Sequence, residues 1–412
     1  MHTAPPRKNP ILATRLPKLP PGSRSRAALG LTAAAALGRF ELQVCSDCGA
    51  VQYPPREACH ACLSERLPWR EQDGVGELLS ETLLHHSNDL FFRERLPWRL
   101  GMVRLDTGVT VVVHLHGDVP RAPARVCVGA RLDRAGQAVL VGFALNEVAN
   151  MADDRQLREM TCDPKFRKVL VTDGKTALGQ ALVSALAQAG AELIWVGRAE
   201  PWKKFPGEER ISHIAQATPV PLDLTDAGSV RELAAQIGGK VDIVINNAEA
   251  HRPFGIGNRP GTDAARLEMD VNYFGLLRLA QELAPALRAR AADGEASACA
   301  WVNLLSIYAL ANFPPHGTYS ASKAAAHSLA QCLRAEMRPA GVRVVNVYPG
   351  PIEDEWNQSL PPPKLAPAAL ASAIVKALQD GVEDVFPGDV AQEWLARWRD
   401  NPKALERELS GG

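Results

Sequence analysis

Tyr319 and Lys323 lie four residues apart in a segment that predicts a long helix from Thr318 to Met337. Residues at this spacing share one face of a helix, so the two side chains are expected to lie side by side. The ammonium of Lys323 would then favour the phenolate of Tyr319, whose ordinary pKa of about 10 is too high for acid/base work near neutral pH. The spacing therefore predicts a tyrosine that exchanges a proton with a substrate.

Ser306 and Asn272 precede this pair in the chain. Ser306 follows an apolar run, Ala300 to Leu305, that predicts a buried strand. Open parallel sheets bind ligands at the carboxyl ends of their strands, where a hydroxyl can polarise a carbonyl group. Each residue alone has an ordinary explanation, since YxxxK arises by chance and a serine after a strand is often a turn residue. The four together, in this order, favour a catalytic set.

Apolar strand-like runs alternate with helical stretches through the C-terminal part of the chain. This alternation predicts an α/β fold with a Rossmann-type, doubly wound parallel sheet. A helix is expected at Gln180–Ala189, and the expected strands, the last with its Pro-Gly exit, are 168–172, 192–196, 220–224, 241–248, 300–305 and 343–350.

With these landmarks, residues from about Lys168 to the C-terminus resemble a short-chain dehydrogenase/reductase. The resemblance implies NAD(P)-dependent reduction of a carbonyl, or the reverse oxidation of an alcohol, with the cofactor carrying the hydride. It implies that Tyr319 is the general acid/base and that Lys323 both lowers its pKa and holds the nicotinamide ribose. Ser306 would orient the carbonyl, and Asn272 would anchor a proton-relay water.

Cofactor-binding residues are implied by the same resemblance. They are Thr172, Gly174, Lys175, Thr176, Leu178, Gly179, Arg198, Asp223, Leu224, Asn247, Ala248, Tyr319, Lys323, Pro349, Gly350 and Ile352. The chain departs from the family pattern at Asp173, Ala177 and Glu249, which stand where glycines are usual, and at Asp354, where a threonine is common. A carboxylate near a diphosphate is electrostatically unfavourable.

The choice of dinucleotide depends on the end of the second strand. Gly197 and Arg198 stand where an acidic residue would bind the ribose of NAD, and Lys203 and Lys204 follow. Arg198, with Lys175, can pair with a 2′-phosphate, so NADP(H) is expected, with NAD(H) as the alternative. The alternative is that these cations simply belong to a solvent-exposed loop.

Two CxxC pairs, Cys45/Cys48 and Cys59/Cys62, are separated by ten residues in the N-terminal third. This spacing lets two tight turns present four thiolates tetrahedrally to Zn²⁺, with no open position, so the site would be structural. Disulfides or a redox CxxC are the alternatives, but neither a βαβ unit nor a secretory context surrounds the pairs.

Five short strands are expected after the cysteines, at 76–84, 100–105, 109–115, 126–132 and 138–144. They suggest a small barrel of the OB-fold type. Together with the cysteine pairs, residues from about Ala27 to Ala144 resemble the zinc-ribbon/OB-fold proteins that accompany thiolases and other acyl-CoA enzymes. This second resemblance implies a thiolase-like partner.

The chain of 412 residues is long enough for two folded units. The expected division is a flexible basic arm at 1–25, a helix, ribbon and barrel at 26–148, a linker at 149–167 and the reductase domain at 168–412. Residues 1–40 contain seven Lys/Arg and no acid, which suggests a docking arm, or less simply a transit peptide. No stretch is apolar and long enough to span a membrane.

Balanced charge, with 46 basic and 46 acidic residues, gives no general attraction to nucleic acid. The expected function is NADPH-dependent reduction of a 3-oxoacyl-CoA or similar thioester, in the cytoplasm, by a dimer or tetramer. The alternative is a catalytically weak or inactive reductase-like scaffold of an acyl-CoA enzyme complex, motivated by the lost glycines. Nucleic-acid binding is disfavoured because the barrel strands lack a series of aromatic platforms.

Overall fold

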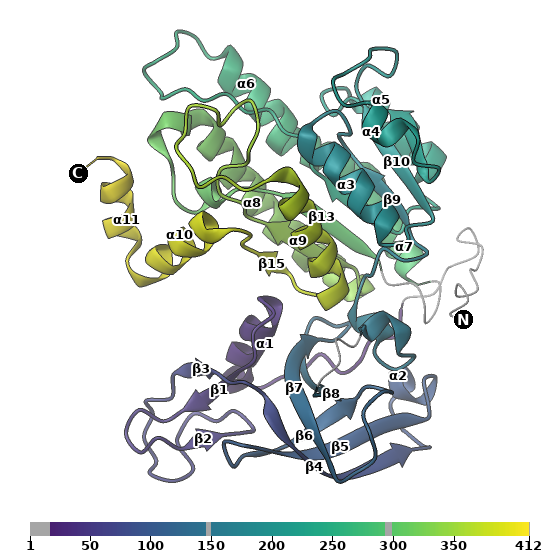
Figure 1. The fold of residues 1–412 in the computed structure, drawn as a ribbon, viewed down its shortest axis with the longest axis vertical. Helices are drawn as coiled ribbons and strands as arrows, with labels where there is room; N and C mark the ends of the chain where they lie inside the picture. The colour runs from purple at the N-terminus through teal and green to yellow at the C-terminus, as the bar shows by residue number, and fades with distance from the viewer. Residues whose placement is uncertain (1–16, 146–149, 293–298, 412) are drawn as a thin grey trace.

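A computed structural model describes residues 17–145, 150–292 and 299–411, and the chain forms two bodies, with α1 lying between them (Figure 1). The smaller body holds a three-stranded sheet and a barrel, and the larger one holds a parallel sheet flanked by helices. Most of the expected basic arm, residues 1–16, lies outside the described residues, as does the expected boundary at 148–149.

The smaller body begins with a short helical turn and α1, where the sequence predicted a helix. Its helices are η2 (Arg26–Ala28), α1 (Leu29–Ala36) and α2 (Leu90–Arg93). The strands of the ribbon, in the order β2-β1-β3, are β1 (Glu41–Val44), β2 (Val51–Gln52) and β3 (Trp69–Glu71). The barrel closes in the order β4-β5-β6-β8-β7, from β4 (Val75–Leu84), β5 (Trp98–Leu105), β6 (Thr110–Leu115), β7 (Ala124–Leu132) and β8 (Ala138–Ala144).

The barrel strands follow from alternating apolar residues, since successive side chains point to opposite faces. In β6, Val111, Val113 and Leu115 are buried inside the barrel while Val112 is exposed. The predicted ribbon and OB-type barrel are therefore confirmed.

In the described part of the chain, the larger body contains a sheet of seven parallel strands in the order β11-β10-β9-β12-β13-β14-β15. Their bounds are β9 (Lys168–Val171), β10 (Leu193–Arg198), β11 (Ala217–Pro221), β12 (Ile243–Asn246), β13 (Ala300–Leu304), β14 (Arg343–Val347) and β15 (Asp384–Val385). The order reverses at β9, between β10 and β12, which is the switch point where such sheets bind ligands at the carboxyl ends of the strands. The predicted doubly wound sheet is confirmed.

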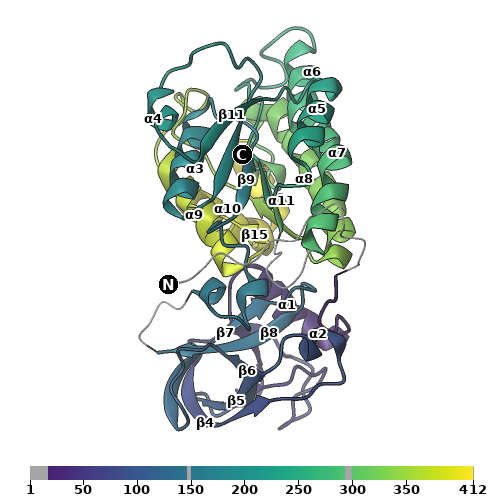
Figure 2. The same cartoon turned by 90° about the vertical axis from the view of Figure 1, so that its right-hand side faces the viewer.

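Helices cover both faces of this sheet (Figure 2). One face is covered by α3 (Ala177–Gln188) and α9 (Pro367–Asp380), through apolar residues such as Leu182 and Ile374. The other is covered by α5 (Ala227–Ile237), α7 (Gly275–Ala291) and α8 (Gly317–Met337), through residues such as Leu279 and Ala330. Strands buried on both faces explain the continuous apolar runs in the sequence.

The remaining helices are short. They are η3 (Met151–Asp153), η4 (Arg158–Met160), α4 (Glu209–Ser212), α6 (Asp263–Met269), the π-helix η5 (Asp270–Phe274), η6 (Ile307–Ala309), η7 (Pro314–His316), η8 (Arg338–Ala340), α10 (Asp389–Asp400) and α11 (Pro402–Leu409). Across residues 17–145, 150–292 and 299–411, none of the helices combines the length and the apolar character that a bilayer crossing requires.

The third strand of the larger body begins and ends earlier than predicted. The sequence favoured 220–224, whereas β11 ends at Pro221. Beyond it, the Asp223 carboxylate accepts hydrogen bonds from the backbone N–H and the hydroxyl of Thr225 and turns the chain toward α5. The prolines in β11 are tolerated because it is an edge strand.

The expected linker is packed against both bodies rather than exposed along its length. Glu159 pairs with Arg95 at 2.6 Å and with Arg134 at 2.5 Å, all three side chains being buried. The Cys162 N–H donates to the Leu378 carbonyl oxygen. These contacts tie the connection to the barrel side and to α9.

We expect Glu159→Ala to lower the free energy of unfolding by about 3–5 kcal/mol, because it removes the buried carboxylate that pairs with the guanidinium groups of Arg95 and Arg134. Urea denaturation followed by circular dichroism measures the effect. Glu77→Ala is the matched control, since it breaks an exposed pair with Arg104 and should cost less than about 1 kcal/mol. Equal losses in the two variants would contradict this assignment.

Candidate active site and metal centre

Tyr319 and Lys323 lie on the first turns of α8, and both face the sheet. Tyr319 is 4% exposed and Lys323 is 1% exposed. The Lys323 Nζ lies 5.5 Å from the centre of the Tyr319 ring and donates a hydrogen bond of 2.9 Å to the carbonyl oxygen of Leu304, at the carboxyl end of β13. The predicted neighbouring pair therefore sits at the expected edge of the sheet.

Glu249 joins the two side chains. It follows β12, and a single oxygen, Oε2, accepts a hydrogen bond of 2.9 Å from the Tyr319 hydroxyl and lies 2.8 Å from the Lys323 Nζ. The carboxylate is 12% exposed. One of the residues that replaced a family glycine thus contacts both of the groups expected to perform acid/base chemistry.

This contact changes the electrostatics of the site. Burial and the adjacent Glu249 carboxylate raise the pKa of Tyr319 well above its ordinary value. Burial would also raise the pKa of Glu249, but the Lys323 ammonium, with smaller contributions from His251 and the Tyr319 hydroxyl, holds it below its usual range. The expectation that Lys323 lowers the pKa of Tyr319 stays a prediction, because burial and Glu249 set the net direction in this arrangement.

Ser306 and Asn272 lie close to α8 and to the loop that carries Glu249. The Ser306 hydroxyl accepts the Tyr308 N–H at 3.2 Å and donates to the Pro349 carbonyl oxygen at 3.5 Å. Asn272, in the π-helix, exchanges two hydrogen bonds of 2.9 Å with the backbone of Ala250 and donates one of 2.8 Å to the Ser322 hydroxyl. Its amide therefore links the Glu249 loop to α8.

His251 and His316 complete the surroundings of the phenol, and neither was predicted as a site residue. The His251 ring stacks on the Tyr319 ring with centres 3.8 Å apart, and its Nε2 lies 2.7 Å from the His316 Nδ1. Burial lowers the pKa of His251 to about 3 and that of His316 to about 4, so both rings are neutral at neutral pH. The sequence signal that could have identified them is their position in the chain, close to Glu249 and Tyr319.

The turn before α3 is tight at its glycines. A Cβ on Gly174 would lie 2.0 Å from the Val196 side chain, and one on Gly179 would lie 2.0 Å from the Asp173 carbonyl oxygen. Asp173 has no positive φ, so it replaces a glycine without backbone strain. Its carboxylate accepts the Lys175 N–H at 2.7 Å and so occupies a donor that a phosphate would use.

The opposite end of the cleft carries charges of both signs. A cavity of about 240 Å³ is lined by four cations and four carboxylates, which are Lys175, Arg198, Lys203, Lys204, Asp173, Glu200, Asp223 and Glu249. The Arg198 guanidinium pairs with Glu208 at 2.9 Å and donates to the Lys203 carbonyl oxygen at 2.7 Å, so part of its donor capacity is already used. Four cations around a polar cavity fit the adenosine 2′-phosphate of NADP(H).

Some of the other residues expected to contact the cofactor lie at this cleft. The Thr172 hydroxyl accepts the N–H groups of Asn247 and Ala248, and the Thr176 hydroxyl caps α3 by accepting the Gly179 N–H. Thr172, Leu224 and Ala248 also line the cavity. Leu178 packs in the core below α3, whereas Pro349, Gly350 and Ile352 lie in the segment after β14, where Ile352 pairs with Leu365.

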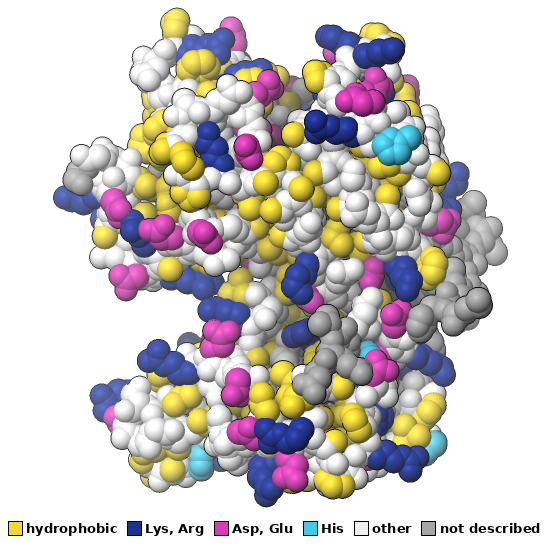
Figure 3. Space-filling model, in the orientation of Figure 1, with side chains coloured by type: hydrophobic (Ala, Val, Ile, Leu, Met, Phe, Trp, Pro, Cys, Tyr) yellow, Lys and Arg dark blue, Asp and Glu magenta, His cyan; other side chains and the backbone are white. Residues whose placement is uncertain are grey.

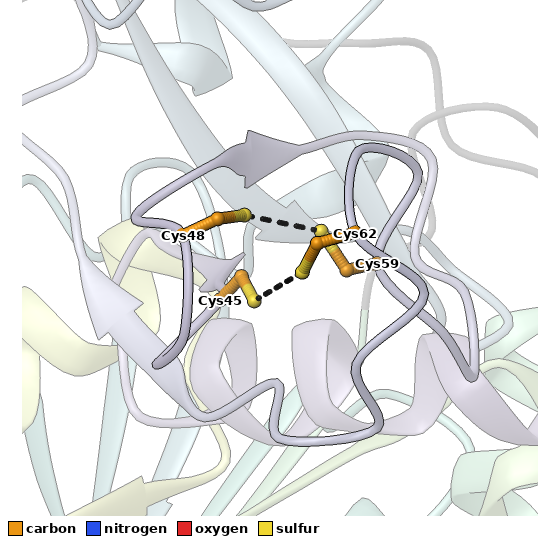
Figure 4. Close-up of side chains that lie close together, drawn as sticks. All are labelled: Cys45, Cys48, Cys59 and Cys62. Carbon is orange, nitrogen blue, oxygen red and sulfur yellow. Dashed lines mark hydrogen bonds between the residues drawn. The ribbon is translucent and has the colours of Figure 1, made fainter.

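The thiol groups of the two CxxC pairs converge from two loops of the ribbon (Figure 4). All four sulfur atoms lie within 4.8 Å of one another, and the Sγ atoms of Cys45 and Cys62 are 3.5 Å apart. Cys45 and Cys59 are buried while Cys48 and Cys62 are exposed. Four thiolates at this spacing suit tetrahedral Zn²⁺ and leave no position for a substrate, so the predicted structural zinc site is supported.

Comparison with known proteins assigns each body. Residues 167–364 match the family described as short chain dehydrogenase. Residues 32–68 match the rubredoxin-like zinc ribbon domain of ChsH2, and residues 69–137 match its C-terminal OB-fold domain.

Two relatives are similar to this chain over about half of its length. The chain is 34% identical over 196 residues to mouse dehydrogenase/reductase SDR family member 7B, covering 44% of this chain and 56% of that protein. It is 32% identical over 202 residues to 1-deoxy-11-beta-hydroxypentalenate dehydrogenase of Streptomyces avermitilis, covering 48% of this chain and 73% of that protein. The chain thus spans little more than half the length of some of these relatives.

A solved structure has the same fold. The short chain dehydrogenase of Burkholderia cenocepacia in complex with NADP is 33% identical, with a TM-score of 0.54, covering 60% of this chain and 98% of that one.

We expect Cys59→Ser to lose the metal and to unfold the ribbon, because structural zinc stabilises small domains directly. Elemental analysis should find one zinc per chain in the wild type and much less in the variant, and a chelator should lower the melting temperature of the wild type alone. Cys332→Ser, at an exposed cysteine of α8, is the control and should keep its zinc. Full zinc content in Cys59→Ser would overturn the assignment.

Proposed function

Because residues 167–364 place the chain in the short-chain dehydrogenase family, we propose that it uses NADPH to reduce the carbonyl of a 3-oxoacyl-CoA or similar thioester, or catalyses the reverse oxidation. The observation that carries the proposal is the meeting of the Tyr319 phenol and the Lys323 ammonium at the carboxyl end of the sheet, next to the charged cleft.

In the proposed reduction, Tyr319 donates its proton to the carbonyl oxygen as the carbon is reduced. The phenol is protonated at neutral pH, as a proton donor must be. Ser306, at the end of β13, holds the same oxygen and orients the carbonyl. Lys323 supplies positive charge beside the phenol and binds the ribose of the nicotinamide. NADPH supplies the hydride.

The thioester part of the proposal is supported by the two N-terminal modules. Ribbon and barrel together match ChsH2 domains, and such modules resemble those that accompany acyl-CoA enzymes. Beside Tyr319, the rings of Tyr308, Phe313 and Trp394 form an apolar wall suited to an acyl chain, with ring centres 5.0 to 5.8 Å apart.

We propose that the barrel recruits an acyl-CoA enzyme such as a thiolase. The paired strands β4, β5 and β6 expose the apolar side chains of Leu83, Met102 and Val112, which are 46%, 43% and 56% exposed. Apolar side chains gathered on neighbouring strands of one outer face are typical of a protein contact. Tethering a reductase to such a partner would raise the local concentration of its substrate.

A catalytically weak subunit of an acyl-CoA enzyme complex is the second candidate. The contact of Glu249 with both Tyr319 and Lys323 favours it, because the two groups are then engaged with each other through a carboxylate. Turnover separates the two candidates: the reductase oxidises NADPH when a 3-oxoacyl-CoA is added, whereas the weak subunit binds the partner with little oxidation.

We expect Tyr319→Phe to lower kcat by about 100-fold or more while leaving the fold intact, because it removes the proton donor and little volume. The assay follows NADPH absorbance with a short 3-oxoacyl-CoA, and circular dichroism checks the fold. Tyr53→Phe, in the ribbon, is the matched control and should retain wild-type turnover. Undiminished turnover in Tyr319→Phe would remove the proposed role.

We expect Arg198→Ala to weaken NADPH binding by about tenfold or more and NADH binding much less, because only NADPH carries the 2′-phosphate that a guanidinium can bind. Isothermal titration of both dinucleotides measures the ratio. Arg210→Ala is the control: Arg210 is exposed on α4 and does not line the cavity. If Arg198→Ala affected both dinucleotides equally, the guanidinium would not select the phosphate.

A further inference from the structure

Lys323 has only three N–H donors, and two are used inside the chain. One goes to the Leu304 carbonyl oxygen and one to the Glu249 carboxylate. Because the ammonium is 1% exposed, little room remains around it for an additional partner. A ribose hydroxyl that binds Lys323 must therefore compete with Glu249.

Glu249 lies on the boundary between the phenol and the cleft. It lines the 240 Å³ cavity together with Thr172 and Asp173, and it also contacts the Tyr319 hydroxyl. No other described residue both lines this cavity and bonds to Tyr319. The side chain thus stands between the two parts that catalysis must bring together.

The other members of this cluster are held in place. His251 stacks on Tyr319 and is fixed by His316, while Lys323 is anchored by Leu304. Glu249 lies in the stretch between β12 and α6, residues 247–262, which forms neither helix nor strand and which also carries His251. Rotation of the Glu249 side chain is therefore the smallest movement that frees Lys323.

Charge also opposes the dinucleotide at this position. Burial raises the pKa of Asp173 and that of Asp354, the latter to about 6. The nearby Glu249 carboxylate contributes to both increases. Its compensating neighbours are Lys323 and, at low pH, His251, whereas Tyr308 and Tyr319 are neutral phenols. An anionic diphosphate entering the cleft adds to this excess of negative charge.

We propose that Glu249 is a positioning residue that occupies Lys323 in place of the nicotinamide ribose and accepts the hydrogen bond of the Tyr319 hydroxyl, so that NADP(H) binds only by displacing this carboxylate. The inference rests on the proposed function, because it assigns Lys323 to the ribose and Tyr319 to the substrate. Cofactor affinity is the main property that Glu249 controls, and the acidity of the Tyr319 phenol is a second readout.

The first test is the affinity of the full chain for NADPH, measured by isothermal titration. Glu249→Gly, which removes the competitor, should tighten binding by about tenfold or more, and Glu249→Gln, which removes only the charge, should tighten it less. Glu353→Gln removes an exposed negative charge near the same edge and should leave the affinity unchanged. Unchanged or weaker binding in both Glu249 variants overturns the proposal.

The second test needs no nucleotide and detects the effect on the phenol. Ultraviolet absorbance follows tyrosine ionisation, and the difference between a protein and its Tyr319→Phe version isolates Tyr319. In Glu249→Gln the phenol should ionise at a lower pH than in the wild type, because the adjacent negative charge is gone while the side-chain volume is kept. Coincident titration curves would show that Glu249 has only a structural role.

The outcomes separate this inference from the proposed function. If the wild type reduces a 3-oxoacyl-CoA and Glu249→Gly binds NADPH no more tightly, the inference fails and the function stands. If Glu249→Gly binds more tightly but no thioester is reduced, the inference stands and the substrate class fails. If neither protein binds NADPH, both the inference and the proposed function fail. If the glycine variant does not fold, Glu249→Gln, which has nearly the same shape as the wild type, replaces it in these comparisons.

Discussion

The buried ammonium of Lys323 is the constraint on which the site depends. A charge removed from water is costly unless it is paired and hydrogen-bonded, and this one is satisfied by the Leu304 carbonyl oxygen and the Glu249 carboxylate. Both partners lie at carboxyl ends of neighbouring strands, β13 and β12, so the sheet itself positions them. The phenol of Tyr319, one helical turn away, enters the same network through the same oxygen of Glu249.

Neighbouring side chains hold the segments that carry this network in place. Asn272 lies in the π-helix between α6 and α7. Its side chain bonds to the backbone of Ala250 and to Ser322 on α8, and these bonds hold the Glu249 loop against the helix that carries Tyr319. Farther away, Arg343 of β14 donates to the carbonyl oxygens of Leu132 and Asp133, joining the sheet to the barrel. Figure 3 shows the two bodies in contact, with a hollow between the C-terminal helices and the ribbon. The hydrogen bonds of Arg343 attach the barrel to the reductase body.

Much of this could be predicted from the sequence, because it depends on local spacing. Continuous apolar runs predicted the strands of the parallel sheet, alternation predicted those of the barrel, and the four cysteines predicted their own cluster. The pairing of Tyr319 with Lys323 follows from helical periodicity alone. Even the expected cations of the cofactor cleft line one cavity.

What could not be predicted depends on contacts between distant segments. Glu249 was noticed as a lost glycine, yet only the approach of β12 to α8 brings its oxygen to the phenol and the ammonium. The stack of His251 on Tyr319 arises in the same way. The stretch 150–167 looked like a polar linker because Glu159 and its neighbours are charged, whereas buried arginines from the barrel side satisfy that charge.

The central claim is that one carboxylate and the nicotinamide ribose compete for one ammonium. A crystal structure of the chain bound to NADP⁺ tests this most directly. The account predicts that the dinucleotide lies in the charged cleft, that the ribose hydroxyls bond to Lys323 and that the Glu249 carboxylate has turned away from both Lys323 and Tyr319. A structure in which Glu249 still bridges Tyr319 and Lys323 while NADP⁺ is fully bound would contradict it.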